Sequence, residues 1–170
     1  MNLSELQKRA YKTAVAKGWH ESDELDANGK PTARQKLAWL ALVMNELDKA
    51  SLEGNELEYA DEKSKPCGVI SEYADAVIRI LDMFGAIGCD TSAFLIPKEK
   101  GTVRQARSTY VDAVRGGFAW QNAQLAVLMF AIIDQLLAIH AVGINELHRV
   151  ILAKMAYNET RSARNGGKLA

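Results

Sequence analysis

Acidic residues recur at helical spacing in one apolar stretch of the sequence, where they could bind a cation. Glu72, Asp75 and Asp82 occur there together with Arg79. Residues three or four apart share a helix face, so these side chains would form one charged stripe beside an apolar one. Because neighbouring carboxylates repel each other, the stripe predicts a cation between them. The cation would be either a hard divalent ion or a basic side chain.

A second apolar stretch, residues 37–48, carries Glu46 among hydrophobic neighbours. A carboxylate in apolar surroundings needs a partner, which makes Glu46 a candidate to join the first group of acids. An acidic stripe is also typical of the solvent-exposed face of an amphipathic helix. Chemistry at this stripe therefore depends on two separate helices bringing their acids together.

The hydrophobic periodicity predicts helices and no strand. The predicted helices span about residues 4–17, 33–52, 69–86, 103–115, 119–142 and 145–158. Ser4 and Asn145 are the expected N-caps of the first and last helix, and Gly85 and Gly88 the expected markers of the frayed end of the third. The fold class is therefore predicted to be all-α, as a multi-helix bundle.

Composition favours one globular domain, predicted over residues 1–160, followed by a flexible basic tail over residues 161–170. The 170 residues are 48% hydrophobic and 25% charged, with a formal net charge of zero. This balance argues against a protein that binds a nucleic acid polymer through a broad basic face. Polar residues interrupt the apolar residues 123–143, so no membrane span is expected. With no secretory signal at residues 1–9, a cytoplasmic location is predicted.

Four segments in order resemble the MazG-like all-α nucleoside triphosphate pyrophosphohydrolases. These are Lys17-Gly18-Trp19, Glu46 on its apolar helix, Glu72-x-x-Asp75 with Arg79 and Asp82, and Lys154-x-x-Tyr157-Asn158-x-x-Arg161 followed by Asn165-Gly166-Gly167-Lys168. The resemblance implies a hydrolase that converts an NTP or dNTP to NMP and pyrophosphate with Mg²⁺ or Mn²⁺. It also implies a homodimer or homotetramer. Residues 90–117 exceed that family's compact core and would form a lid, a dimer arm or a substitute for a second subunit's helices.

The resemblance also implies roles for individual residues. Glu46, Glu72 and Asp75 match the metal-binding acids. Lys154, Tyr157, Asn158 and Arg161 match the segment that binds the nucleoside triphosphate. Further candidate site residues are Asp48, Lys49, Arg79, Asp82 and Lys168.

The family's usual motif in this region is Glu-Glu-x-x-Glu. This chain departs from it at two positions, where Asn45 replaces the first acid and Lys49 replaces the last. An amide cannot act as a general base, and a protonated amine cannot ligate a hard cation. Asp48, Glu53 or Glu58 could restore the lost charge. Lys49 could stand among the acids in place of a metal ion, or pair with Glu53 one turn along its helix. A catalytically inactive helical scaffold that binds a nucleotide or a protein is therefore the alternative function.

Overall fold

The computed structural model describes residues 2–53, 58–59, 65–92, 94 and 96–163, and it confirms the all-α prediction. Its helices are α1 (Leu3–Ala16), α2 (Ala33–Ala50), α3 (Val69–Ala86), α4 (Val103–Arg115), α5 (Gln121–His140) and α6 (Ile144–Thr160). Two strands of two residues each, β1 (Glu58–Tyr59) and β2 (Pro66–Cys67), pair antiparallel. The prediction that no strand is present was wrong on this point, although the pairing does not alter the helical character of the fold.

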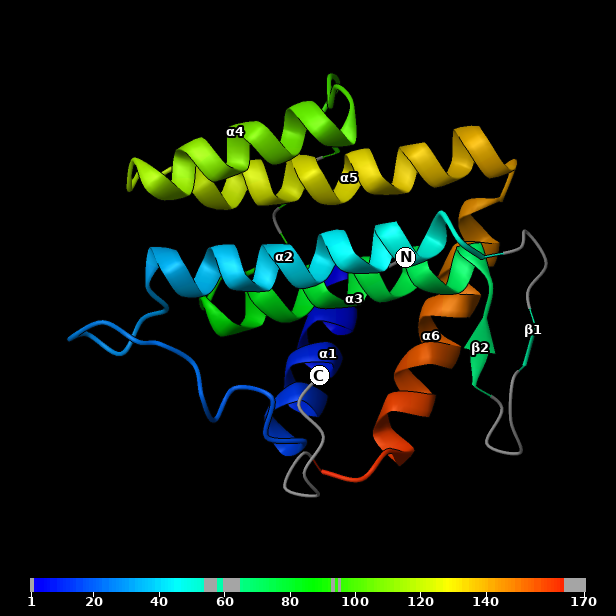
Figure 1. Cartoon of the computed structure of the whole chain (residues 1–170), viewed down its shortest axis with the longest axis horizontal. Helices are drawn as coiled ribbons and strands as arrows, with labels where there is room; N and C mark the ends of the chain where they lie inside the picture. The colour runs from blue at the N-terminus through cyan, green and yellow to red at the C-terminus, as the bar shows by residue number, and fades with distance from the viewer. Residues whose placement is uncertain (1, 54–57, 60–64, 93, 95, 164–170) are drawn as a thin grey trace.

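Helix α3 lies at the centre of the structure and contacts α1, α2, α5 and α6. In Figure 1, α4 and α5 lie together on one side of α2 and α3, while α1 and α6 lie on the other. Most residues of α3 are buried, in keeping with this position. A polar side chain on α3 can therefore meet partners from several parts of the chain.

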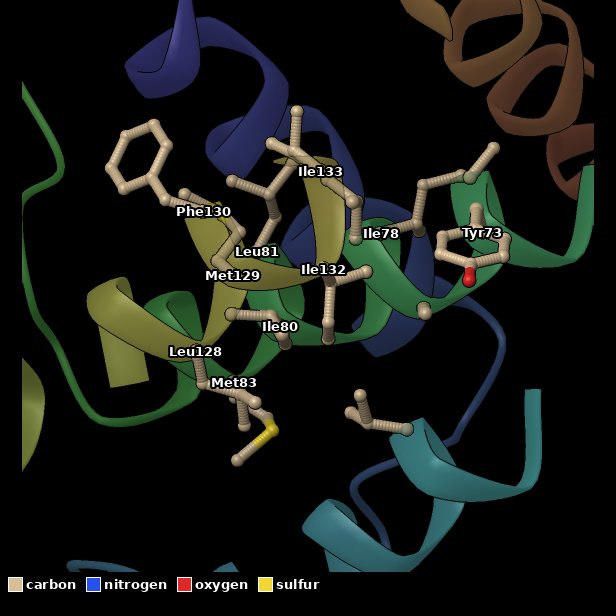
Figure 2. Packing of buried hydrophobic residues seen from close by; sticks show 14 of the residues in the cluster. Tyr73, Ile78, Ile80, Leu81, Met83, Leu128, Met129, Phe130, Ile132 and Ile133 are labelled. Atoms are coloured by element: carbon tan, nitrogen blue, oxygen red, sulfur yellow. The ribbon is translucent and has the colours of Figure 1, made fainter. Parts of the chain in front are cut away.

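The hydrophobic core fills the space between α3 and α5, as Figure 2 shows. Ile80 and Leu81 of α3 are fully buried, as are Leu128 and Ile132 of α5. By length and composition alone, α5 is apolar enough to cross a membrane. Many of its apolar side chains nevertheless pack inside this core, where each buried aliphatic side chain contributes about 1.5 to 3 kcal/mol.

Gly85 lies inside α3, where it allows α1 to approach closely. A Cβ atom at this position would lie 2.4 Å from Cβ of Tyr11, which is too short for any real contact. The sequence indicated only that Gly85 marks the frayed end of its helix. The structure shows that the missing side chain is needed for helix packing.

The helix caps differ from two of the predictions. Asn2, and not Ser4, caps α1, because its Oδ1 accepts a hydrogen bond from the backbone N–H of Glu5 at 3.3 Å. Gly143 takes the N-cap position of α6, and Asn145 lies within the helix without capping it. In both cases the helix begins before the polar residue that the sequence favoured.

Lys17 links the end of α1 to the end of α6. Its ammonium donates to the carbonyl oxygen of Glu159 at 2.8 Å and also to that of Arg161. The last carbonyls of a helix have no partner within it, so the ammonium satisfies groups that would otherwise need water. The predicted flexible tail lies largely outside the described residues, which end at Ala163.

Candidate functional site

Glu46, Glu72 and Asp75 converge on one point, as the sequence predicted they would. Glu46 lies near the end of α2, while Glu72 and Asp75 lie in the first two turns of α3. One carboxylate oxygen from each lies within 4.8 Å of those of the other two. We refer to these three residues as the acidic triad. Its geometry requires α2 and α3 to run side by side, which the contacts between them provide.

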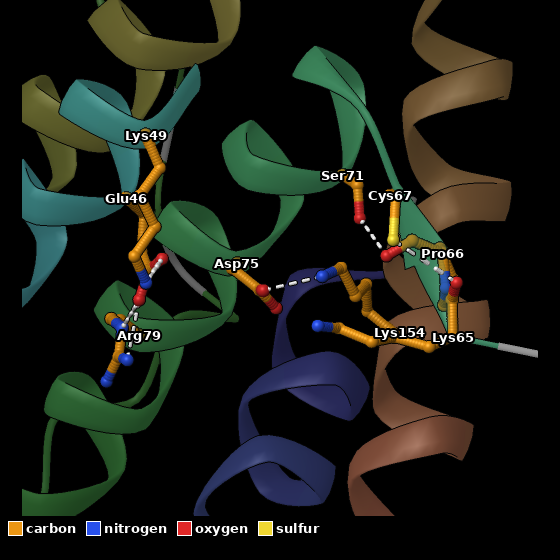
Figure 3. A network of polar contacts seen from close by, with 9 residues as sticks. All are labelled: Glu46, Lys49, Lys65, Pro66, Cys67, Ser71, Asp75, Arg79 and Lys154. Atoms are coloured by element: carbon orange, nitrogen blue, oxygen red, sulfur yellow. Dashed lines mark hydrogen bonds and ion pairs between the residues drawn. The ribbon is translucent and has the colours of Figure 1, made fainter. Parts of the chain in front are cut away.

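Glu46 is buried and ion-paired through both of its carboxylate oxygens (Figure 3). Its side chain is only 2% exposed. Oε1 accepts from Arg79, at 2.7 Å from Nε and 2.6 Å from Nη2. Oε2 accepts from Nζ of Lys49 at 2.7 Å. Lys49 therefore stands among the acids, which was one of the two positions that the sequence left open.

Asp75 pairs with a buried lysine from the far end of the chain. Lys154 of α6, with a side chain 3% exposed, donates from Nζ to Oδ2 of Asp75 at 2.7 Å. Figure 3 also shows the Lys65 side chain pointing toward Asp75. Lys65 was not predicted from the sequence, because nothing in its local pattern distinguishes it from Lys63 in the same connector before Pro66.

The triad members have opposite tendencies to ionise. Burial opposes ionisation of Glu46, but Arg79 and Lys49 outweigh it and lower its pKa below the usual value. Burial raises the pKa of Glu72. Lys154 works against this effect, and the neighbouring carboxylates of Asp75 and Glu46 add to it. Additional positive charge beside Glu72 would therefore stabilise the ionised form of its carboxyl group.

The donor chemistry of the triad fits a hard divalent cation. Its oxygens belong to carboxylates, which are the protein ligands that Mg²⁺ and Mn²⁺ prefer. Two of these carboxylates already contact basic side chains, Glu46 those of Lys49 and Arg79, and Asp75 that of Lys154. The site is thus compatible with both kinds of cation predicted from the sequence, a hard divalent ion and a basic side chain. In the structure, basic side chains contact the carboxylates.

Asp82 shares the stripe of α3 but belongs to a different cluster. Its Oδ1 lies 2.9 Å from Nε2 of His20, and Nδ1 of His20 lies 2.5 Å from Oδ2 of Asp23. Burial alone would lower the pKa of His20, but hydrogen bonds and charges from Asp82 and Asp23 raise it to about 9. The rings of Tyr11 and Trp39 flank the imidazole at centroid distances of 5.5 and 5.6 Å. We call His20, Asp23 and Asp82 the histidine clasp.

The other candidate residues differ in how far they are exposed to solvent. Tyr157 is half-buried and Asn158 buried on the turn of α6 that follows Lys154. Arg161 is exposed and follows the end of α6, where its carbonyl accepts from Lys17. Asp48 is exposed on α2. Lys168 falls outside the described residues.

A cleft of about 560 Å³ lies beside α1, away from the triad side chains. Its lining residues are Glu5, Lys8, Arg9, Lys12, Thr13, Ala16, Lys17 and Glu159. Arg9 is already paired there with Glu159, at 2.7 Å between Nε and Oε1. None of the triad acids lines this cleft.

Comparison of the chain with protein-family models, with curated proteins and with solved structures found no match. The resemblance to the MazG-like enzymes stays a prediction based on the residues quoted above. The basis for a functional proposal is the chemistry of the triad and its cations.

Proposed function

We propose that this protein is a magnesium-dependent nucleoside triphosphate pyrophosphohydrolase, which converts an NTP or dNTP to NMP and pyrophosphate. The observation that carries this proposal is the convergence of Glu46, Glu72 and Asp75 within 4.8 Å, beside the buried Lys154. Carboxylates that bind a divalent ion, next to an ammonium that binds phosphate, are the groups that phosphoryl chemistry requires.

In the proposed reaction, water attacks the α-phosphorus of the triphosphate. A new P–O bond forms, and the bond from the α-phosphorus to the bridging oxygen breaks. The electron pair of that bond leaves with pyrophosphate, while a carboxylate of the triad takes the proton of the water and releases it to solvent. Because negative charge accumulates on the phosphate oxygens, electrostatic stabilisation is the main contribution the protein can make.

Residues of the chain have separate roles in this proposal. Glu46, Glu72 and Asp75 would hold a magnesium ion, which supplies positive charge to the phosphate oxygens and acidifies the attacking water. Arg79 holds the Glu46 carboxylate in place through a hydrogen bond from Nε and an ion-pair contact of Nη2 with the same oxygen. When the nucleotide binds, the ammonium of Lys154 would move from Asp75 and donate a hydrogen bond to a phosphate oxygen.

The test is to incubate the purified protein with a panel of canonical and modified (d)NTPs and Mg²⁺ or Mn²⁺. The expected products are the nucleoside monophosphate and pyrophosphate, resolved by ion-exchange chromatography. Glu72→Gln should lower kcat about a hundredfold or more, since one of three charged ligands is lost. Asp134→Asn provides a matched control, because this carboxylate lies on α5 and pairs with Lys100.

Absence of turnover with every nucleotide in the panel would contradict the proposal. Equal loss of activity in Glu72→Gln and Asp134→Asn would also contradict it, since the activity would then not depend on the triad. Circular dichroism of both variants separates a loss of activity from a loss of folding.

A non-catalytic helical scaffold is a second candidate, which the ion pairs of the triad favour. Both oxygens of Glu46 and one of Asp75 are already satisfied by basic side chains. For such a scaffold we expect no hydrolysis and no calorimetric binding of Mn²⁺ in the presence of a nucleoside triphosphate analogue. The enzyme proposal requires both hydrolysis and binding of Mn²⁺.

A further inference from the structure

Both carboxylate oxygens of Glu46 are held by basic side chains of the protein. Glu46 can therefore ligate a divalent ion only if it shares an oxygen with one of these side chains or if one of them leaves. Its Oε1 accepts from Arg79 and its Oε2 accepts from Lys49. A further cation on the same carboxylate would lie close to both and would be repelled by them. Which of the two basic residues gives way determines how the site binds its ion.

The two basic residues hold Glu46 with different strength. Arg79 donates from Nε of a planar guanidinium, whose Nη2 lies 2.6 Å from the same oxygen, and its side chain is 30% exposed. Lys49 donates from a single nitrogen at the end of a flexible stem, and its side chain is 49% exposed. An ammonium that is half in water exchanges its carboxylate partner easily. Lys49 is therefore the residue that can leave.

Charge balance connects the binding of the ion to the binding of an anion. Lys49 and Arg79 pair with Glu46, Lys154 pairs with Asp75, and the Lys65 side chain points toward Asp75, so the basic groups at the site at least balance the three carboxylates when all are ionised. A divalent ion alone would leave the site with excess positive charge. A triphosphate that arrives with the ion removes this excess and offers phosphate oxygens to Lys49 and Lys154.

We propose that Lys49 is an internal counter-cation of the acidic triad, which occupies Glu46 until a divalent ion and a polyphosphate bind together. This inference rests on the proposed function, because it concerns the same site. In the free protein Lys49 weakens binding of the ion alone. In the complex its ammonium moves from Glu46 to a phosphate oxygen, so the ion and the triphosphate strengthen each other's binding.

The experiment is calorimetric titration of the full chain with Mn²⁺, first alone and then with a nucleoside triphosphate whose α and β phosphorus atoms are joined by a methylene group. Lys49→Met should bind Mn²⁺ alone at least tenfold more tightly than the wild type. The analogue should raise the affinity of the wild type for Mn²⁺ at least tenfold and that of Lys49→Met by less. Lys49→Gln serves as a second variant if the methionine impairs folding.

Lys100→Met is the matched control, because it removes an ammonium that pairs with Asp134 and not with an acid of the triad. It should bind Mn²⁺ as the wild type does. Equal affinities of wild type and Lys49→Met for Mn²⁺ alone would overturn the inference, and hydrolysis by the wild type would then still uphold the proposed function. Absence of Mn²⁺ binding by either protein, even with the analogue, would overturn both.

Discussion

His20 donates through Nε2 to Asp82 at 2.9 Å, which fastens the loop after α1 to the central helix α3. The other ring nitrogen faces Asp23, so both nitrogens meet groups that accept hydrogen bonds when ionised. Such a ring is positively charged, in agreement with its raised pKa of about 9. The charged imidazole pairs with two carboxylates, and one of them, Asp82, lies on the same helix as Glu72 and Asp75.

The histidine clasp should make stability depend on pH. The pKa of His20 is higher in the folded protein than its usual 6.5, so the folded state binds the proton more tightly. Its contribution, on the order of 3 kcal/mol at most, is fully present below pH 6.5 and is lost as the pH rises to about 9. Urea denaturation across this range should show the decline in the wild type and not in His20→Gln. His148→Gln, on α6, should follow the wild type, and an identical pH profile for all three proteins would refute the clasp.

Breaking the buried pair between Lys154 and Asp75 should destabilise the protein. Lys154→Met leaves the Asp75 carboxylate without the ammonium that donates to it at 2.7 Å and should cost about 2 kcal/mol in the free energy of unfolding. The double variant Lys154→Met with Asp75→Asn should cost less, because no uncompensated charge remains. Chemical denaturation of the four proteins in the cycle measures this coupling. Additive losses would show that the two side chains do not interact.

Under the enzyme proposal, Lys49→Glu should lower the Mg²⁺ concentration that hydrolysis requires. The change removes an ammonium from Glu46 and adds a carboxylate to the triad, which increases the negative charge available to the ion. We expect the Mg²⁺ concentration for half-maximal hydrolysis to fall about tenfold, which corresponds to about 1.4 kcal/mol. Lys12→Glu makes the same charge change on the exposed face of α1 and should leave the Mg²⁺ dependence unaltered. An unchanged or higher Mg²⁺ requirement in Lys49→Glu would contradict this expectation.

Ala141, which ends α5, has a left-handed backbone with φ of 51°. This conformation costs a non-glycine residue about 1 kcal/mol, so Ala141→Gly should raise the thermal midpoint. Ala138→Gly, one turn earlier on the exposed side of α5, should lower it, since glycine weakens a helix interior by up to about 1 kcal/mol. Differential scanning calorimetry reports both midpoints. Shifts of the same sign would show that the backbone at Ala141 is not strained.

The sequence allowed the helices to be predicted because their apolar residues repeat with helical periodicity. The bounds of α3 and α4 agree with the prediction, since glycine or proline follows or precedes each of them closely. The pairing of β1 with β2 could not be predicted, because two-residue strands carry no periodicity. Gly85 was misinterpreted for a related reason: its role depends on Tyr11, which is distant in the sequence.

The site was predictable in its acids but not in its ion pairs. Shared helix faces placed Glu72 near Asp75, yet Asp82 lies ten residues beyond Glu72, which is about 15 Å along a helix and too far to join the triad. The sequence left the partner of Lys49 undecided between the triad acids and Glu53. Its choice of Glu46 depends on rotamers and on the burial of that carboxylate, neither of which the sequence specifies.

Lys17 and Lys154 join α6 to helices that precede it in the sequence. Lys17 extends from α1 to the end of α6, and Lys154 of α6 reaches the acids of α3. During synthesis on the ribosome, α1 to α5 emerge while both of these attachments still lack a partner. The ion pair between Lys154 and Asp75 can therefore form only after most of α6 has been translated, so a chain that stops before Lys154 would leave Asp75 without this partner.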